Sequence, residues 1–326
     1  MPRNRNYDII RAIAILMVMC IHCMMPLKDS LVEGSCALSN WVCEFYYALI
    51  SAGVPMFFML SGALLLSKQE PWLEFYKKRL KRIIIPFIIW SVIVYFLSTF
   101  IHPRGNVVFY VKDFFTLLCT KGVNAAYWFV YMLLGFYLVT PLCRKLVQKL
   151  SRDYFWVGAI GITGLYLIGF YLSLFFPASK ELCRWLCSFC FYVGGYFCSQ
   201  IHFSMQKQWS NIVLISFLLI LYTICSVFQI RYIPCTLIYA FSLFICINQC
   251  SSKKTCPNDV ISVFSRNGYG IYLSHVIFCG ILMRVPFFLE HVPLMILPVI
   301  ATILVAIIEY GMMWVIEKLG WNRWLC

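Results

Sequence analysis

The chain has 326 residues, of which 62% are hydrophobic and only 12% are charged, and its mean hydropathy is +0.82. Soluble domains carry about 45–50% apolar and about 25% charged residues, so this composition excludes a soluble enzyme, a disordered chain and a disulfide-rich secreted module. It predicts a polytopic membrane protein. The net charge is +14, from 27 Lys and Arg against 13 Asp and Glu, and in a membrane protein such an excess must first be compared with the loop positions.

Ten apolar segments approach the roughly 20 residues that a helix needs to cross a bilayer, and none shows the alternation of a β-barrel. We expect helices at about 7–27, 41–67, 83–101, 125–143, 155–176, 184–201, 211–229, 232–250, 268–289 and 293–317. If the N-terminus is cytoplasmic, the C-terminus is too, and 19 Lys and Arg lie inside against 8 outside. This split follows the positive-inside rule, so topology explains most of the charge without a nucleic-acid partner. The sequence predicts one all-α domain over residues 1–326, embedded in the bilayer.

The 17 cysteines lie mostly within predicted spans, where they behave as small apolar residues. Only four are expected near an oxidising outer face: Cys36, Cys43, Cys119 and Cys183. Cys183, Cys187 and Cys190 repeat at helical spacing, but no His partners stand close by to close a zinc site. We therefore expect packing roles for them and no metal.

The first helix carries three ionisable residues, Asp8, Arg11 and His22, which are costly inside a membrane. Arg11 and His22 are eleven residues apart, or three turns plus about 20°, so they share one face about 16 Å apart along the axis. Asp8 can pair with Arg11. Arg11 is expected at the cytoplasmic end of this helix and His22 deep in the membrane. This arrangement suits an elongated anionic cofactor that enters from the cytoplasm and presents its reactive end to a base. Alternatively, Asp8 and Arg11 anchor the helix end and His22 bonds a neighbouring helix.

The second helix contains Pro55, which predicts a kink, and Ser61-Gly62, which permits close helix approach. The following segment reads Arg79-Leu80-Lys81-Arg82 within a dense run of cations. Guanidinium groups match phosphate oxygens, so these arginines can hold a polyphosphate or anionic lipid heads, although a topological anchor explains part of the charge.

Four polar residues near the C-terminal end are further candidates: Asn267, Tyr272, His275 and Glu309. His275 is a second intramembrane imidazole, and a hydrogen-bonded structural role is as compatible with it as catalysis. Glu309 is a carboxylate within the last span, which could orient a His or neutralise an Arg.

Five stretches, taken in order, resemble motifs of the membrane-bound acyltransferase 3 family: Arg11 with His22, Phe57 to Gly62, Arg79 with Arg82, Tyr127-Trp128-Phe129 followed by Pro141, and Tyr269 to His275. The resemblance spans nearly the whole chain. It implies a ten-helix enzyme of the bacterial inner membrane that takes an acyl group, usually acetyl, from cytoplasmic acyl-CoA. The acceptor would be a hydroxyl of a sugar or cell-surface glycan, which makes the chain an O-acetyltransferase with acetyl-CoA as donor.

The same resemblance implies that His22 is the catalytic base and that Arg11, Arg79 and Arg82 hold the coenzyme's phosphates. His275 is expected to share in catalysis, and His275, Tyr272 and Asn267 are alternative donors to the oxyanion. The other candidates are expected to contact substrate or support the site: Asp8, Ser61, Trp128 and Glu309. Direct transfer and a covalent acyl-enzyme both stay open, as do the acceptor, the acyl chain length and the oligomeric state.

An exporter of a small anion or of a lipid-linked sugar is the alternative, because it too would use polar residues within the membrane. We find no inverted repeat and no matched pair of broken helices, which such transporters often have. A sensory or structural membrane protein is a third class, and it has little need for Arg11 and His22 on one stripe. Acetyl-CoA binding separates the enzyme from the other two.

Overall fold

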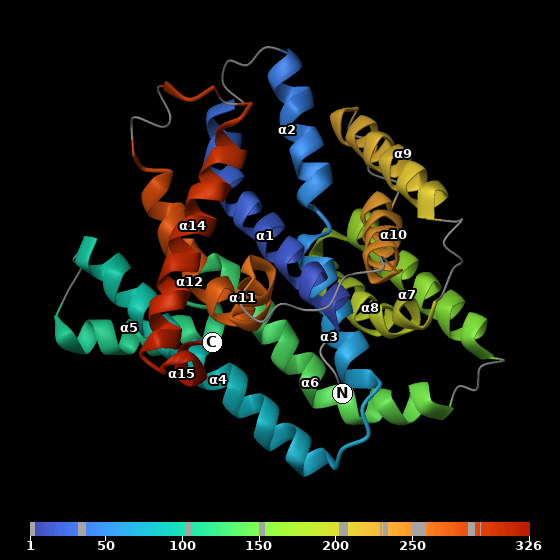
Figure 1. Cartoon of the computed structure of the whole chain (residues 1–326), viewed down its shortest axis with the longest axis horizontal. Helices are drawn as coiled ribbons and strands as arrows, with labels where there is room; N and C mark the ends of the chain where they lie inside the picture. Colours follow the sequence, from blue (N-terminus) through green and yellow to red (C-terminus); the bar gives the residue numbers. More distant parts are fainter. Residues whose placement is uncertain are drawn as a thin grey trace.

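The computed structural model describes residues 4–31, 37–101, 106–149, 154–201, 208–228, 230, 234–249, 259–285, 291–293 and 295–326. Within these residues every regular element is helical, which confirms the all-α prediction (Figure 1). The helices are α1 (Arg5–Leu31), α2 (Ala37–Ile50), α3 (Gly53–Leu66), α4 (Trp72–Ile101), α5 (Val107–Thr120), α6 (Trp128–Lys149), α7 (Phe155–Phe175), α8 (Lys180–Gln200), α9 (Gln208–Val227), α10 (Cys235–Gln249), α11 (Val260–Arg266), α12 (Gly268–Leu282), α14 (Leu297–Lys318) and α15 (Asn322–Leu325).

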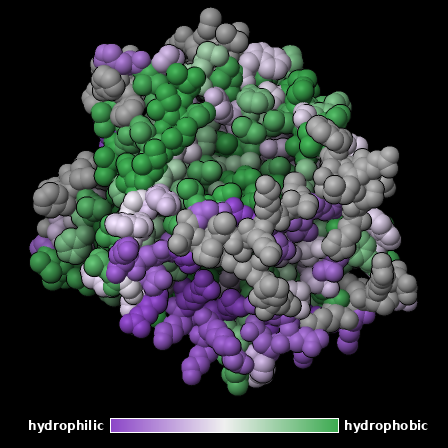
Figure 2. Space-filling view, in the orientation of Figure 1, coloured by the Kyte–Doolittle hydropathy of each residue, from purple (hydrophilic) through white to green (hydrophobic). Residues whose placement is uncertain are grey.

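Six segments of the described chain have the length and apolar composition to cross a bilayer: Arg5–Met25, Trp41–Leu66, Trp72–Thr99, Val107–Val147, Phe155–Phe175 and Leu297–Lys318. Three shorter apolar helices accompany them: Ile212–Val227, Cys235–Gln249 and Gly268–Leu282. Hydrophilic side chains gather in the lower part of the view, where α4 and α15 lie, and apolar ones dominate above them (Figure 2). The chain is therefore an integral membrane protein, while the count of ten crossings and the side on which the termini lie stay predictions.

The segment expected as one helix at 41–67 is two helices, α2 and α3, separated by a turn at Ser51 and Ala52. Pro55 causes this break, because it has no N–H to donate to the Ser51 carbonyl and its ring crowds that carbonyl. The predicted kink is therefore an interruption, and the helical bonds resume when Met56 N donates to the Ala52 carbonyl at 2.9 Å.

Two segments expected outside the spans are helical. Helix α4 begins at Trp72 rather than near residue 83, so Arg79 and Arg82 project from a continuous helix and their directions are fixed. Helix α5 occupies most of the expected loop 102–124. Its start is capped by Asn106, whose side chain accepts a hydrogen bond from Phe109 N at 2.9 Å, which satisfies one of the free N–H groups of the first turn.

Helices α3 and α8 pack with their backbones in contact, as the Ser61-Gly62 pair predicts. A Cβ on Gly62 would lie 1.6 Å from the Tyr192 carbonyl oxygen, and one on Gly195 would lie 2.0 Å from the Met59 carbonyl oxygen. Both contacts involve main-chain atoms, which cannot move aside as a flexible side chain can. Glycine is required at both positions.

Gly62→Ala is therefore expected to destabilise the protein by about 1–3 kcal/mol or more, because the added methyl forces the two helices apart. The measurement is the midpoint of thermal unfolding in detergent. Gly161→Ala is the matched control, since a Cβ there meets nothing within 4 Å. Equal unfolding temperatures for Gly62→Ala and Gly161→Ala would contradict the close packing.

Candidate active site

Helices α1 and α12 lie against each other and run in the same direction. At one end, a Cβ on Gly268 would come within 2.9 Å of the Arg11 side chain. Further along both helices, the rings of His22 and His275 face each other with centroids 5.0 Å apart and planes inclined by 59°. The two imidazoles predicted separately from the sequence therefore form one pair.

Each imidazole of this pair has hydrogen-bonding capacity to spare. His275 is 1% exposed, and its Nδ1 lies 3.2 Å from the Ile271 carbonyl oxygen. Because a carbonyl only accepts, we assign the proton to Nδ1, which leaves a lone pair on Nε2. This Nε2 is buried and has no partner within the described residues. His22 is partly exposed, and the described part of the chain offers its ring no hydrogen bond, so it is free to meet a substrate.

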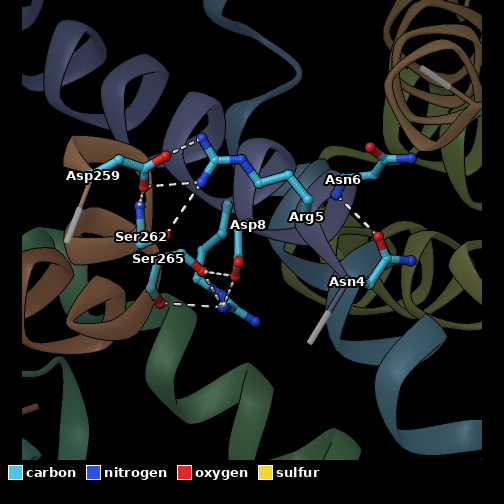
Figure 3. A network of polar contacts seen from close by, with 8 residues as sticks. Asn4, Arg5, Asn6, Asp8, Asp259, Ser262 and Ser265 are labelled. Atoms are coloured by element: carbon cyan, nitrogen blue, oxygen red, sulfur yellow. Dashed lines mark hydrogen bonds and ion pairs between the residues drawn. The ribbon is translucent and has the colours of Figure 1, made fainter. Parts of the chain in front are cut away.

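Arg11 is held at the other end of the α1 stripe by helix α11. Its Nη1 donates to the carbonyl oxygen and the hydroxyl of Ser265, at 3.1 and 2.6 Å. The Ser265 hydroxyl donates in turn to Asp8 Oδ1 at 2.5 Å, and Arg11 lies 3.9 Å from that oxygen (Figure 3). The predicted pairing of Asp8 with Arg11 is confirmed, and Ser265 is the additional residue that fixes both.

A second ion pair joins the start of α1 to α11. Arg5 donates to Asp259 Oδ1 at 2.9 Å and to the Ser262 hydroxyl at 3.2 Å (Figure 3). Asp259 caps α11 by accepting from Ser262 N at 2.8 Å. The hydrogen bond from Arg5, with that from Ser262, holds the pKa of the Asp259 carboxyl below its usual range. These contacts set the register of α1 against α11 and hence the place of Arg11.

A cavity of ≈ 450 Å³ opens between these helix ends, which we call the basic cavity. The three arginines that are predicted to bind phosphate, Arg11, Arg79 and Arg82, all line it, as do Ser61 and Tyr272. Two further cations that were not predicted to bind phosphate also line it, Lys68 and Arg266. The other lining residues are Phe57, Leu64, Leu65, Ile83, Phe129, Leu133, Tyr137, Ser265, Gly268 and Tyr269. No Asp or Glu is among these lining residues, so the cavity favours an anion.

Three of the five cations have no acidic partner. Within the described part of the chain, Lys68, Arg79 and Arg82 make no ion pair, and the Nε of Arg79 is buried without a hydrogen bond. Burial and then the charge of Arg79 lower the pKa of Lys68 and outweigh the opposite effect of Glu70, so positive charge prevails at the cavity edge. Arg266 differs, because Glu317 accepts two bonds from it, both at 2.7 Å.

The loop that carries Lys68 is fastened by a buried arginine of α6. Arg144 donates from Nη2 to Glu70 at 2.9 Å and from Nε to the Leu65 carbonyl oxygen at 2.7 Å, and its guanidinium stands 4.5 Å from the centroid of the Phe75 ring. Burial alone would raise the pKa of Glu70, but the bond and charge of Arg144 bring it below its usual range. Arg144 is thus the ion-pair partner of Glu70, and Lys68 lines the cavity.

Aromatic rings separate the basic cavity from the histidine pair. Tyr272 packs on Phe129 and Phe57 with centroids 4.9 and 6.2 Å apart, and all three line the cavity. On its other side, Tyr272 lies 5.6 Å from the His275 ring. The pair therefore begins one turn of α12 beyond this wall. The Tyr272 hydroxyl, a predicted oxyanion donor, donates to the Ala126 carbonyl oxygen.

Two other predicted residues lie outside the basic cavity. Asn267 is fully buried and donates to Glu317 at 2.6 Å, so one of its two amide hydrogens is engaged. Trp128 lies beneath the guanidinium of Arg184, 5.6 Å from the ring centroid, and its neighbour Phe129 takes the place at the cavity.

Glu309 is fully buried, and both of its oxygens lie within hydrogen-bond distance of the Ser274 hydroxyl, at 2.8 and 2.9 Å. No His or Arg of the described residues pairs with it. Of the cysteines expected near the outer face, Cys43, Cys119 and Cys183 are free thiols, and Cys36 lies outside the described residues. Among the residues described, no cluster of His, Cys, Asp or Glu has the make-up of a metal site.

A family model described as an acyltransferase domain, that of the acyltransferase 3 family, matches residues 4–314. This span contains every residue that lines the basic cavity and both histidines of the pair. No curated protein and no solved structure matches the chain. The family match favours the enzyme over the exporter among the classes that the sequence left open. The chain is an integral membrane acyltransferase and belongs to the acyltransferase 3 family.

Proposed function

We propose that this acyltransferase moves an acyl group, most simply acetyl, from acyl-CoA to a hydroxyl of a sugar in a cell-surface glycan. The observation that carries the proposal is the basic cavity, in which Lys68, Arg79 and Arg82 form no ion pair with any described residue and whose wall residue Tyr272 packs beside His275. Coenzyme A has phosphates at one end and a thioester at the tip of a long, narrow arm. Its charged end suits the cations, and its arm suits the apolar and aromatic side chains of the same cavity, among them Phe57, Phe129 and Tyr272.

The charge distribution supports a cytoplasmic entrance for this donor. Arg11, Arg82 and Arg266 come from three different helices, α1, α4 and α11, and all lie at the same cavity. The positive-inside rule assigns a face with this excess of cations to the cytoplasm, where acyl-CoA is made. In this orientation both termini are cytoplasmic, the bundle crosses ten times, and the histidine pair lies toward the outer half of a bacterial plasma membrane.

The transfer itself needs one base and one leaving thiol. His22 accepts the proton of the acceptor hydroxyl as its oxygen attacks the thioester carbonyl carbon. The carbon–sulfur bond then breaks, and the sulfur takes the proton from the His22 imidazolium, which gives an ester and free coenzyme A. The unpaired Nε2 of His275 stands beside His22, so it can hold that proton between the two steps and return it to His22 before the sulfur is protonated.

The donor to the oxyanion can be inferred from which hydrogen-bond donors already have a partner, and the route of the acceptor can be inferred from the exposure of His22. The Tyr272 hydroxyl donates to Ala126, and Asn267 precedes His275 by eight residues, about 12 Å along α12, which leaves His275 as the oxyanion donor once its Nε2 carries a proton. His22 is partly exposed and Met25, less than one turn further, is 51% exposed. An acceptor can therefore reach His22 from the side opposite the basic cavity.

The test is calorimetric titration of the purified protein in lipid nanodiscs with acetyl-CoA. We expect saturable binding that acetyl-pantetheine, which has the same thioester and arm but no phosphate, does not reproduce. Mass spectrometry of surface glycans from cells with and without the gene then identifies the acceptor. Absence of any acetyl-CoA binding would contradict the proposal and return the exporter to consideration.

A further inference from the structure

A second basic cavity of ≈ 370 Å³ adjoins the first and has no role in the transfer chemistry described above. We call it the outer basic cavity, because it is lined by residues of α4 and α15 at the hydrophilic end of the molecule. Its cations are Lys78, Lys81, Arg82, Arg266 and Arg323. Arg82 and Arg266 also line the basic cavity, so the two spaces share a wall of two guanidinium groups.

Much of the charge in the outer basic cavity is uncompensated. Lys78 pairs with Glu74 at 2.5 Å, and Glu317 neutralises Arg266. Lys81, Arg82 and Arg323, in contrast, form no ion pair with any described residue, and no Asp or Glu is among the lining residues. Three free cations around one small space repel one another, and an anion between them relieves that repulsion.

The position of Arg323 is fixed by the docking of α15. Gly320 has a φ of 70°, a left-handed conformation that lets the chain reverse after α14. Trp90 Nε1 then donates to the Leu325 carbonyl oxygen at 3.0 Å. A Cβ on Gly270 would come within 2.5 Å of the same oxygen, so α15 lies directly on α12. These contacts hold α15 against α4 and α12, which brings Arg323 to the same cavity as Lys81.

We infer that the outer basic cavity binds the phosphate on the ribose of acyl-CoA, while the basic cavity binds its diphosphate and arm. This inference rests on the proposed function. Coenzyme A carries two phosphate groups, a diphosphate and a ribose monophosphate, on either side of one sugar ring. Two adjoining cavities that share Arg82 match two anions joined by a short linker. Arg82 stands where both groups come nearest to each other, and Lys81 and Arg323 serve the ribose phosphate alone.

The same chemistry, a phosphate monoester among cations, is also presented by free phosphate and by anionic lipid heads. The experiment therefore compares coenzyme A with 3′-dephospho-coenzyme A by calorimetry, in nanodiscs of neutral or of anionic lipid. In the wild-type protein we expect coenzyme A to bind at least about tenfold more tightly, as the loss of one well-paired charged group predicts. This preference should be the same in both lipids.

The double variant Lys81→Met with Arg323→Met is expected to bind coenzyme A about tenfold more weakly and to bind 3′-dephospho-coenzyme A as the wild type does. The unchanged second affinity also shows that the variant is folded. Lys145→Met is the matched control, since Lys145 is exposed and lines neither cavity. Both ligands should bind to it with wild-type affinity.

Three results would overturn the inference. The first is that the double variant loses affinity for both ligands equally. This would mean that the two cations attract any anion and do not contact the ribose phosphate in particular. The second is that the preference for coenzyme A over 3′-dephospho-coenzyme A disappears in anionic nanodiscs. This would mean that lipid heads or free phosphate occupy the cavity. The third is a wild-type protein that binds both ligands equally. Failure of the wild type to bind either ligand would instead refute the proposed function, and the two failures are thereby distinguished.

Discussion

His22→Ala is expected to abolish acyl transfer and to leave acyl-CoA binding intact. A positioned general base contributes roughly 10²–10⁴-fold to such a reaction, and alanine offers no group to replace it. Binding is expected to persist because His22 does not line the basic cavity, where the phosphates are expected to dock. The ring also makes no hydrogen bond within the described part of the chain, so its removal leaves no buried partner unsatisfied.

The measurement has two readouts. Acylation of surface glycans is followed by mass spectrometry in a deletion strain that carries the variant, and acetyl-CoA affinity is measured on the purified protein. His291→Ala is the control, because His291 is exposed and lies outside the site. Wild-type acylation by His22→Ala would show that His22 is not the base, and loss of both readouts would indicate a structural role.

The stripe on α1 could be predicted from the sequence because helical periodicity is local. Eleven residues fix the relative direction of Arg11 and His22 whatever surrounds them, and Asp8 lies within reach of Arg11 on the same helix. The distortion at Pro55 is similarly local, since it follows from the missing N–H, although the sequence predicts a kink where the structure has two helices. Where a conclusion depends on one helix only, the sequence suffices.

Contacts between distant helices could not be derived in this way. Ser265 bonds to Arg11 and Asp8 across more than 250 positions, and no periodicity relates α11 to α1. Lys68 and Arg266 were counted only as topological charges, although both line the basic cavity. The sequence holds no signal for them, because Glu70 lies two positions from Lys68 and only the structure shows that Arg144 binds this carboxylate.

The aromatic stretch shows a third limit, which is the rotation of a helix at its start. A 3-10 turn at Ala125–Tyr127 precedes α6, so the direction of each ring depends on where that turn ends. In the structure Tyr127 bonds to the Leu273 carbonyl oxygen, Phe129 lines the cavity and Trp128 faces Arg184. The motif indicates the segment, and the rotation of the helix decides which of its rings lines the basic cavity.

The double variant Arg79→Gln with Arg82→Gln is expected to weaken acyl-CoA binding by about 100-fold or more. A hydrogen bond between charged groups contributes roughly 1.5–3 kcal/mol, and each arginine can offer more than one donor to a phosphate. Arg82 is exposed, so its share is reduced by solvent, and the larger part of the effect is expected from the half-buried Arg79. Higher salt should narrow the difference between variant and wild type.

Thermal stability is expected to change in the opposite direction. In the unliganded protein the Nε of Arg79 is buried and has no hydrogen-bond partner among the described residues. The charge of Arg79 also repels that of Lys68 and lowers its pKa. Removing the two charges relieves this repulsion, so the unfolding midpoint should stay the same or rise, as is usual where a binding site is strained for function. Lys145→Gln, which removes an exposed cation outside both cavities, should alter neither quantity. Weaker acyl-CoA binding together with a lower unfolding midpoint would mean that the two arginines stabilise the fold. Weaker binding with an unchanged or higher midpoint would mean that they serve to bind an anion.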